Sequence, residues 1–289
     1  MASILTNLFD GVAYGMLLFV LACGLAVTLG LMNFVNLAHG AFAMAGGYIC
    51  AVLVNNSGWP FFAALPLAFV GSALIGIALE RTLYRHLYSR SHLDQVLFSI
   101  GLVFMSVAAV DYIMGSSRVF IKLPAALEGQ IDLFGVGIGR YRLMIVVICG
   151  LLTLALQLIL AKTRFGSRLR AAVDDPRAAI GLGINVPQVF AFTFAFGCGL
   201  AGLGGALSAE ILGLDPYFPL KFMIYFLIVV TVGGSSSITG PFLASLLLGI
   251  ADVAGKYYVP KVGPFVIYTV MIVILLWRPN GLFGRTAAR

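Results

Sequence analysis

Long unbroken apolar runs constrain the fold of this chain more than any other feature of its sequence. Six of them reach the roughly 20 residues that span the hydrocarbon core of a bilayer as a helix, near 11–30, 60–80, 94–114, 141–161, 187–207 and 262–278. Shorter or glycine-interrupted runs lie near 41–55, 222–232 and 240–255. Because these runs are continuous rather than alternating in polarity, they favour helices over a membrane barrel. The sequence therefore predicts an all-α fold, a polytopic membrane helix bundle of about eight to nine transmembrane helices with broken or re-entrant segments.

The composition makes lipid the expected solvent for most of the chain. Of the 289 residues, 61% are hydrophobic and 10% are charged, and the mean hydropathy is +1.05. Soluble domains carry about a quarter charged residues. The polar stretches near 81–93, 115–140 and 162–186 are too short to build a core of their own, so residues 1–289 are expected to form a single transmembrane domain. Within the second stretch, the glycines between 135 and 139 favour a turn-rich external loop or hairpin.

The positive charges predict topology rather than nucleic-acid binding. Eleven of the 18 basic residues fall on three segments: Arg81, Arg85 and Arg90; Lys162, Arg164, Arg168, Arg170 and Arg177; and Arg278, Arg285 and Arg289. If nine segments cross, all three lie on one side, which the positive-inside rule makes cytoplasmic. The N-terminus is then expected outside and the C-terminus inside. The loop with Arg118, Lys122, Arg140 and Arg142 argues the other way, although it is longer and also carries Glu128 and Asp132.

Isolated polar side chains within the apolar runs point away from proton-coupled transport. Glu80, Asp111, Glu210 and Asp252 each stand at or near the end of a run, so they are expected at the membrane interface rather than in a relay. The four cysteines, Cys23, Cys50, Cys149 and Cys198, lack metal-ligand spacing and are expected to be small buried side chains. No HExxH, paired-carboxylate or nucleophile motif is present, so the chain is not expected to be an enzyme.

The stretch from Lys162 to Val186 contains the clearest local signal outside the apolar runs. Asp174 or Asp175 can cap a short helix, Pro176 suits its first turn, and Gly181 and Gly183 can end it, which predicts a helix over about 174–182. A short helix flanked by basic residues between two spanning helices fits a docking element for a cytoplasmic partner. A solvated loop whose charges only fix topology is the alternative reading.

Two apolar regions are interrupted by polar or glycine-rich residues. The first, Gly30 to Gly40, contains Asn33, Asn36 and His39; the second, Thr231 to Pro241, contains Gly233, Gly234 and Ser235. Broken helices at membrane depth, one in each half of a chain, are typical of a transporter's substrate path. Two ordinary loops at the membrane surface would give the same pattern. The second region lacks the GxxxxGK[ST] pattern, so it does not predict ATP binding.

At these residues the sequence resembles the permease subunits of branched-chain (hydrophobic) amino acid ABC importers. Four blocks carry the resemblance in order: Thr28 to Tyr48, Thr163 to Phe194, Val229 to Ile250, and the closing Trp277 to Arg285, which reads WRPNGLFGR. The third block departs from the family in having three serines where Gly-Ser is more usual. A sugar-type permease shares part of the pattern but usually lacks the closing block.

The resemblance implies a permease domain whose cytoplasmic coupling loop spans about 163–186. It implies coupling to an ATPase through Arg164, Gly166, Arg170, Asp174, Asp175, Pro176, Arg177, Ala178, Gly181 and Gly183. It implies a translocation path near Asn33, Asn36, His39, Gly40, Gly233, Gly234 and Ser235. No cofactor or metal is implied in this chain, because ATP would be bound by partner subunits.

The implied partners are a second homologous permease, two cytoplasmic ATPases, a periplasmic substrate-binding protein and membrane lipid, with no nucleic acid. The implied location is the bacterial inner membrane and the implied solute a branched-chain or related hydrophobic amino acid. The resemblance favours leucine, isoleucine and valine, while related importers that take urea, short amides or aromatic acids are the alternative within the family. An ion-coupled secondary transporter and a passive channel are the alternatives of a different class.

Overall fold

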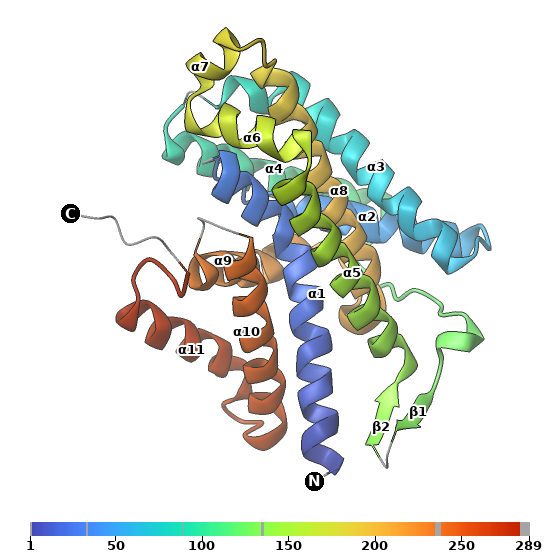
Figure 1. Ribbon diagram of the computed structural model, residues 1–289. Coiled ribbons are helices and arrows are strands. Elements are labelled where there is room, and N and C mark those ends of the chain that lie inside the picture. The colour runs from blue at the N-terminus through green and yellow to red at the C-terminus, as the bar shows by residue number, and fades with distance from the viewer. Residues whose placement is uncertain (1, 33, 89, 134–135, 235–237, 284–289) are drawn as a thin grey trace.

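The chain forms a helical bundle in the computed structural model, which describes residues 2–32, 34–88, 90–133, 136–234 and 238–283 (Figure 1). The helices are α1 (Ala2–Met32), α2 (His39–Ala51), α3 (Phe61–Thr82), α4 (His92–Met114), α5 (Arg140–Lys162), α6 (Arg164–Asp174), α7 (Pro176–Gly181), α8 (Val186–Leu212), α9 (Phe218–Gly233), α10 (Thr239–Tyr258) and α11 (Gly263–Trp277). A π-helical turn, Val52–Asn56, extends α2, and short 3₁₀ turns span Tyr84–His86 and Ala125–Leu127. Strands β1 (Gln130–Leu133) and β2 (Val136–Gly139) pair as an antiparallel hairpin.

The apolar runs correspond to helices, which confirms the predicted all-α membrane fold. Among the described residues, α1, α3, α4, α5 and α8 are long and apolar enough to cross a membrane, while α9 and α11 are shorter apolar helices. The hairpin expected between 135 and 139 forms from β1 and β2, although Gly135 itself lies outside the described residues. All four cysteines are buried and free, as expected.

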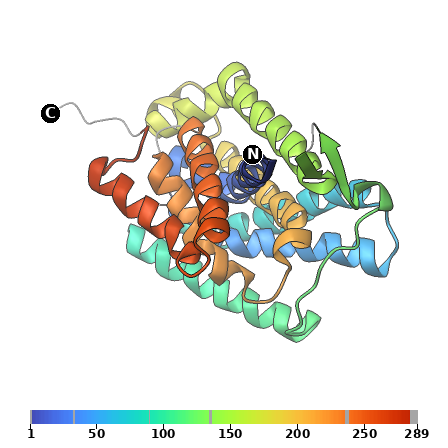
Figure 2. The ribbon, with the colours of Figure 1, turned by 90° about the horizontal axis from the view of Figure 1, so that it is seen from below.

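Helices α1 and α8 form the centre of the bundle. Both are mostly buried along their apolar windows, whereas α3, α4 and α5 expose most of theirs. Figure 2 shows α1 near the middle of the molecule when it is viewed from the N-terminal end, with the other helices around it. In a bilayer the outward apolar side chains of the peripheral helices face lipid. Only the central helices therefore need to be surrounded by protein.

Glycines on α8 allow this close packing. A Cβ at Gly205 would collide with the backbone carbonyl of Ala43 on α2. A Cβ at Gly46, also on α2, would collide with the backbone of Gly202 on α8. Gly197 lies against Gly24 on α1, where a Cβ would find Gly24 Cα at 3.3 Å. Gly197 and Gly205 therefore serve the close packing of helix backbones.

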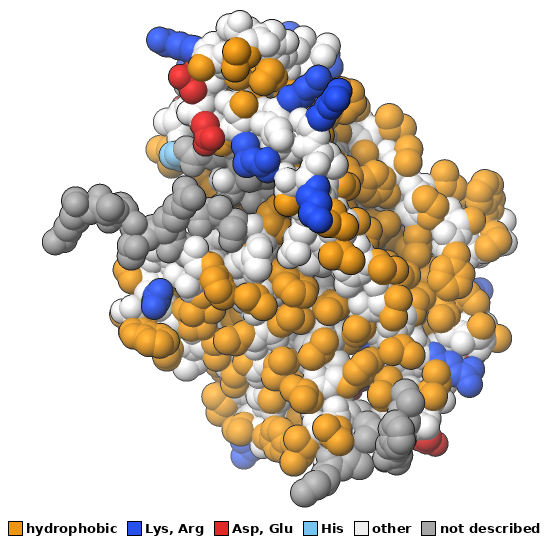
Figure 3. All heavy atoms as spheres, in the orientation of Figure 1, with side chains coloured by type: hydrophobic (Ala, Val, Ile, Leu, Met, Phe, Trp, Pro, Cys, Tyr) orange, Lys and Arg blue, Asp and Glu red, His pale blue; other side chains and the backbone are white. Residues whose placement is uncertain are grey.

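The charged side chains separate along the axis of the bundle. Figure 1 places α6 and α7 at one end and the N-terminus with the β1–β2 hairpin at the other. In Figure 3 lysines and arginines gather over α6 and α7, and hydrophobic side chains cover most of the surface between the two ends. Such a band flanked by charge is the surface expected of a chain that crosses a bilayer several times.

A test of the central packing compares two glycines. Gly205→Ala places a methyl group against the Ala43 carbonyl, so we expect it to reduce the free energy of unfolding by about 1–3 kcal/mol and to lower Tm in detergent. Gly150→Ala, on α5, is the control because nothing lies within 4 Å of its added Cβ. Equal Tm values for the two variants would contradict the packing described for α8.

Candidate coupling surface and translocation path

The helix expected at 174–182 is present as α7. The Asp175 carboxylate caps it, with Oδ1 accepting hydrogen bonds from the Arg177 amide at 2.9 Å and the Ala178 amide at 3.0 Å. Pro176 occupies the first turn, where its missing amide hydrogen removes no helical bond. Gly183 follows the helix with a φ of +79°, a left-handed conformation that glycine adopts without strain.

A second helix in this stretch, α6, was not predicted. It begins at Thr163, whose hydroxyl accepts a hydrogen bond from the Gly166 amide at 3.3 Å. Gly166 packs so closely against the Leu160 backbone that a Cβ there would collide with it. Arg170 donates a hydrogen bond to the Leu160 carbonyl, which ties α6 back to the end of α5. The sequence analysis interpreted the arginines of this segment as a sign of topology, and for that reason did not identify the short apolar face of the helix.

Both short helices are attached to the start of α8 by a small apolar cluster. The cluster consists of the buried side chains of Leu169, Ala172, Ala179, Val186 and Val189. Because these contacts join α6, α7 and the first turns of α8, the three elements form one packed unit at this end of the molecule.

The outer side of α7 exposes apolar side chains. Ile180 is 59% exposed and Leu182 is 80% exposed. Arg177 is exposed nearby in sequence, as are Ala178 and Gly181. The predicted coupling residues, Arg164, Gly166, Arg170, Asp174, Asp175, Pro176, Arg177, Ala178, Gly181 and Gly183, all lie on α6, on α7 or at their ends. Ile180 and Leu182 belong to the same surface and were not singled out from the sequence, although two branched apolar residues in a polar stretch were a usable signal.

The first interrupted region lies inside the protein, not in a surface loop. Phe34 is 1% exposed, and Asn36 and His39 are 0% exposed. His39 packs beside Gly24 and Gly197, which stand well inside α1 and α8 rather than at their ends. Of the two readings of this region, the structure supports the interior one. Asn33 lies outside the described residues.

Asn36 organises the turn between α1 and α2. Its side-chain Oδ1 accepts hydrogen bonds from the Ala38 amide and from the Tyr84 hydroxyl, both at 3.0 Å. The Gln95 Oε1 accepts from the Val35 amide at 3.1 Å. Tyr84 and Gln95 are buried and join this turn to the α3–α4 connection, but sequence reasoning missed both because they stand in or beside a stretch read as a polar loop.

Three polar atoms in this turn keep unused hydrogen-bonding capacity. The Asn36 Nδ2 and both ring nitrogens of His39 are buried without a hydrogen-bond partner among the described residues. Phe42 and Phe194 lie beside the His39 ring, with centroid separations of 6.0 and 6.3 Å. Buried polar groups without partners are destabilising. These three nitrogens could therefore form hydrogen bonds in a different conformation of the turn, or with a polar molecule that reached it.

The beginning of the second interrupted region packs against the C-terminal segment. Gly233 ends α9 and Gly234 follows with a φ of +85°. The Leu282 amide donates to the Val232 carbonyl at 2.8 Å, and a Cβ at Gly281 would meet the Gly234 amide nitrogen at 2.7 Å. Two of the sequence blocks that carry the family resemblance therefore pack on each other. Ser235 lies outside the described residues.

The two interrupted regions are not brought together. Gly40 packs on Pro219 at the beginning of α9, whereas Gly233 and Gly234 stand at its other end. With 1.5 Å of rise per residue, these ends are separated by about 20 Å. Among the described path residues, Gly40 thus lies at one end of α9 and Gly233 and Gly234 at the other.

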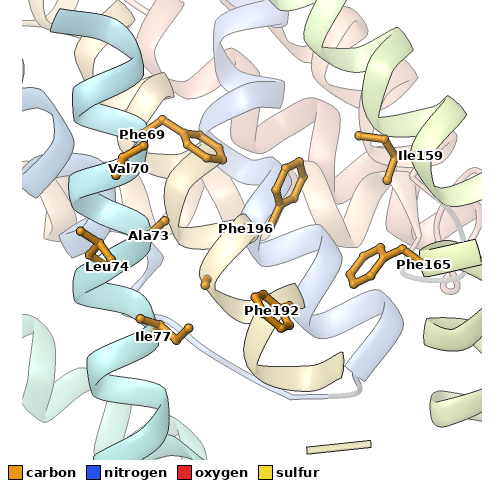
Figure 4. A pocket seen from close by; sticks show the side chains of 10 residues that line it. Phe69, Val70, Ala73, Leu74, Ile77, Ile159, Phe165, Phe192 and Phe196 are labelled. Carbon is orange, nitrogen blue, oxygen red and sulfur yellow. The ribbon is translucent and has the colours of Figure 1, made fainter. Parts of the chain in front are cut away.

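One cavity in the described part of the chain lies apart from both interrupted regions. An apolar groove of 440 Å³ lies between α3, α5, α6 and α8, with Phe69, Phe165, Phe192 and Phe196 among its lining residues (Figure 4). Its wholly apolar lining suits a hydrocarbon chain rather than a charged solute. Within the described ranges, no group of three or more His, Cys, Asp and Glu side chains could hold a metal ion.

Comparison with known proteins connects this architecture to transport. The family model for the permease component of branched-chain amino acid transport systems matches residues 7–275. The high-affinity branched-chain amino acid transport system permease proteins LivH of Escherichia coli and BraD of Pseudomonas aeruginosa are each 29% identical, over 97% of this chain and 96% of their own. The corresponding permease protein LivM of Salmonella typhimurium is 25% identical over 94% of this chain and 68% of its own. No solved structure matches.

The hydrogen bond between Tyr84 and Asn36 supplies a test of the interior turn. Tyr84→Phe removes the donor and keeps the ring, so we expect the free energy of unfolding to fall by about 1 kcal/mol, measured as a lower Tm in detergent. Tyr112→Phe is the matched control because Tyr112 is 92% exposed on α4. A Tyr84→Phe variant as stable as the control would show that this bond does not hold the turn.

Proposed function

Because this chain belongs to the family of permease components of branched-chain amino acid transport systems, we propose that it is a transmembrane subunit of an ATP-driven importer. It would move branched-chain or related hydrophobic amino acids across the bacterial inner membrane. As a member of a transport family it is a multi-pass membrane permease and not an enzyme. The observation that carries the mechanism is the packed unit of α6, α7 and the start of α8, with its exposed apolar tip.

The α6–α7 unit is proposed as the surface that receives the ATPase. A side chain such as Leu182, 80% exposed beside basic residues, is poorly suited to water and well suited to a groove on a protein partner. The cap at Asp175 and the positive φ at Gly183 fix the shape of α7, so it can transmit force without unfolding.

Helix α8 would carry that force into the membrane domain. Its first turns share the apolar cluster with α6 and α7, and further along it Phe194 packs on Tyr84 with ring centroids 4.6 Å apart. Gly197 on the same helix lies beside His39. A displacement of α7 would therefore reach the turn around Asn36 through one continuous helix.

The translocation path is proposed to open at this turn, which is closed in the present conformation. Asn36 and His39 would offer their unpartnered nitrogens to a solute once α8 moves away, while Gly40, Gly233 and Gly234 let the adjoining helices move closely past one another. Asn33 and Ser235 belong to the same two stretches of sequence.

The proposal requires partners and an orientation. The assembly would contain a second homologous permease, two cytoplasmic ATPases that bind ATP, and a periplasmic binding protein that delivers the solute. This chain would need no cofactor of its own. The basic side chains that gather over α6 and α7 support a cytoplasmic location for that end. The N-terminus would then be periplasmic, and the C-terminus is proposed to be cytoplasmic.

Charge and shape changes on α7 test the coupling surface. Arg177→Glu and Leu182→Glu should leave the complex assembled but reduce ATP-dependent uptake at least tenfold, because the ATPase can no longer seat on α7. Lys122→Glu, a charge reversal on an exposed residue between α4 and α5, is the control. Uptake and ATP hydrolysis are measured together in proteoliposomes. Normal uptake by both α7 variants would refute the coupling assignment.

Uptake of labelled leucine tests the class and the solute. The chain reconstituted with its partners should accumulate leucine only with ATP, and unlabelled isoleucine should suppress that uptake. Uptake without the ATPases would favour an ion-coupled transporter instead. ATP hydrolysis stimulated by the binding protein without leucine uptake would keep the class and move the solute to urea, short amides or aromatic acids.

A further inference from the structure

A cavity with charged walls lies at the end of the molecule opposite α6 and α7. It has a volume of 220 Å³ and is lined by residues of α1, α5, α8 and α10. These are the beginnings of α1 and α5 and the ends of α8 and α10, which meet near the N-terminus (Figures 1 and 2). No predicted site residue lines it.

Glycines bring its two main walls together. A Cβ at Gly11 on α1 would meet the Ile250 Cα on α10 at 2.7 Å, and one at Gly15 would meet the Ser245 carbonyl oxygen at 2.6 Å. Because the two backbones are this close, side chains that follow on α10 are pressed against α1. Asp252 is consequently 1% exposed.

Four charged side chains face this cavity, two of each sign. Asp10 on α1 forms an ion pair with Arg142 on α5. Asp252 Oδ2 accepts a hydrogen bond from Lys256 Nζ at 2.5 Å, one turn further along α10. The Lys256 ammonium also lies 5.7 Å from the centre of the Tyr14 ring.

Asp252 retains unused capacity within this arrangement. Its Oδ1 is buried and has no hydrogen-bond partner in the described part of the chain. A buried carboxylate normally satisfies both oxygens, and one left without a donor is destabilising. Both cations, by contrast, are partly exposed, with 44% of the Arg142 side chain and 47% of the Lys256 side chain accessible. The cavity thus places a buried carboxylate oxygen without a hydrogen-bond partner beside two partly exposed, ion-paired cations.

The remaining lining is apolar. Ala13, Ile211, Leu212 and Val253 contribute to the wall beside the charged groups. An aliphatic side chain placed there would lose water-accessible surface against hydrocarbon, which stabilises binding.

We propose that this cavity binds a zwitterionic aliphatic amino acid, as an entry site on the periplasmic side of the permease. This inference rests on the proposed function, which supplies the orientation and the solute class. The α-ammonium would donate to Asp252 Oδ1, the α-carboxylate would accept from Arg142 and Lys256, and the side chain would lie on Leu212 and its neighbours. The balance of charges selects the zwitterion, because a simple anion meets two carboxylates and a simple cation meets two positive groups.

Occupation of the site would also release an internal contact. A carboxylate that takes the Arg142 guanidinium competes with Asp10 for the same donors. Since the Asp10–Arg142 pair joins α1 to α5, arrival of the solute would loosen these helices at the periplasmic end. The site would therefore favour inward movement of the solute by opening the helices in front of it.

Direct binding to the full chain in lipid nanodiscs tests the proposal without any partner. Saturation-transfer NMR would compare L-leucine with 4-methylpentanoate, which lacks the ammonium, and with isopentylamine, which lacks the carboxylate. We expect both analogues to bind at least tenfold more weakly than leucine. Asp252→Asn and Arg142→Gln should each weaken leucine binding at least tenfold. Asp111→Asn on α4 is the control and should bind leucine as the unmodified chain does.

The outcomes separate this site from the proposed function. Equal binding of leucine and its two analogues, or unchanged binding by a folded Arg142→Gln variant, would overturn the site. Should Asp252→Asn fail to fold, Arg142→Gln and the analogue series decide alone. No leucine binding to the chain together with ATP-driven leucine uptake by the assembly would refute the site and leave the transport function standing. Selective leucine binding to the chain without leucine uptake by the assembly would support the site and contradict the proposed transport of leucine.

Discussion

The close approach of α8 to α1 and α2 is the contact on which the rest of this structure depends. In lipid, apolar surface alone gives helices little reason to associate, so backbone proximity and dense packing must hold the bundle. Gly197 against Gly24 and Gly205 against the Ala43 carbonyl provide that proximity. With these contacts in place α1 and α8 are covered by protein, and the outer helices remain free to face lipid.

The same contacts allow a non-helical turn to exist inside the bundle. Backbone that leaves the helical pattern must find hydrogen bonds from the protein, because lipid offers none. Between α1 and α2 these bonds come from the Asn36 and Gln95 side chains, which accept from the Ala38 and Val35 amides. Tyr84 then holds Asn36 in position. The interior turn is thus built from groups far apart in the sequence and can change only if α8 or the α3–α4 connection moves.

The sequence was sufficient to predict the apolar helices and α7, although not α6, because the apolar runs and the ends of α7 depend on local chemistry. Apolar runs of spanning length, an aspartate before a proline and a glycine after the last turn all act over a few residues. The sequence did not predict the contacts between segments that are far apart in the chain. Tyr84 and Asp252 illustrate the limit: the first stood in a stretch read as a cytoplasmic loop and the second at the edge of an apolar run, yet both are buried. The burial of Asp252 follows from the glycine contacts between α1 and α10, and that of Tyr84 from its contacts with Asn36 and Phe194. Single-sequence patterns do not define such contacts.

The arrangement of α1 and α8 connects all three regions of functional interest. Helix α1 carries Asp10 beside the cavity near the N-terminus and Gly24 beside His39. Helix α8 carries Leu212 at that cavity and Val186 in the cluster that holds α7. Neither helix contains a proline beyond its first turn, so each can tilt as a rigid body. A tilt that opens the cavity at one end of such a pair moves the coupling surface at the other. Binding of the solute and seating of the ATPase would then act on the same two helices, and neither could change without affecting the closed turn around Asn36 between them.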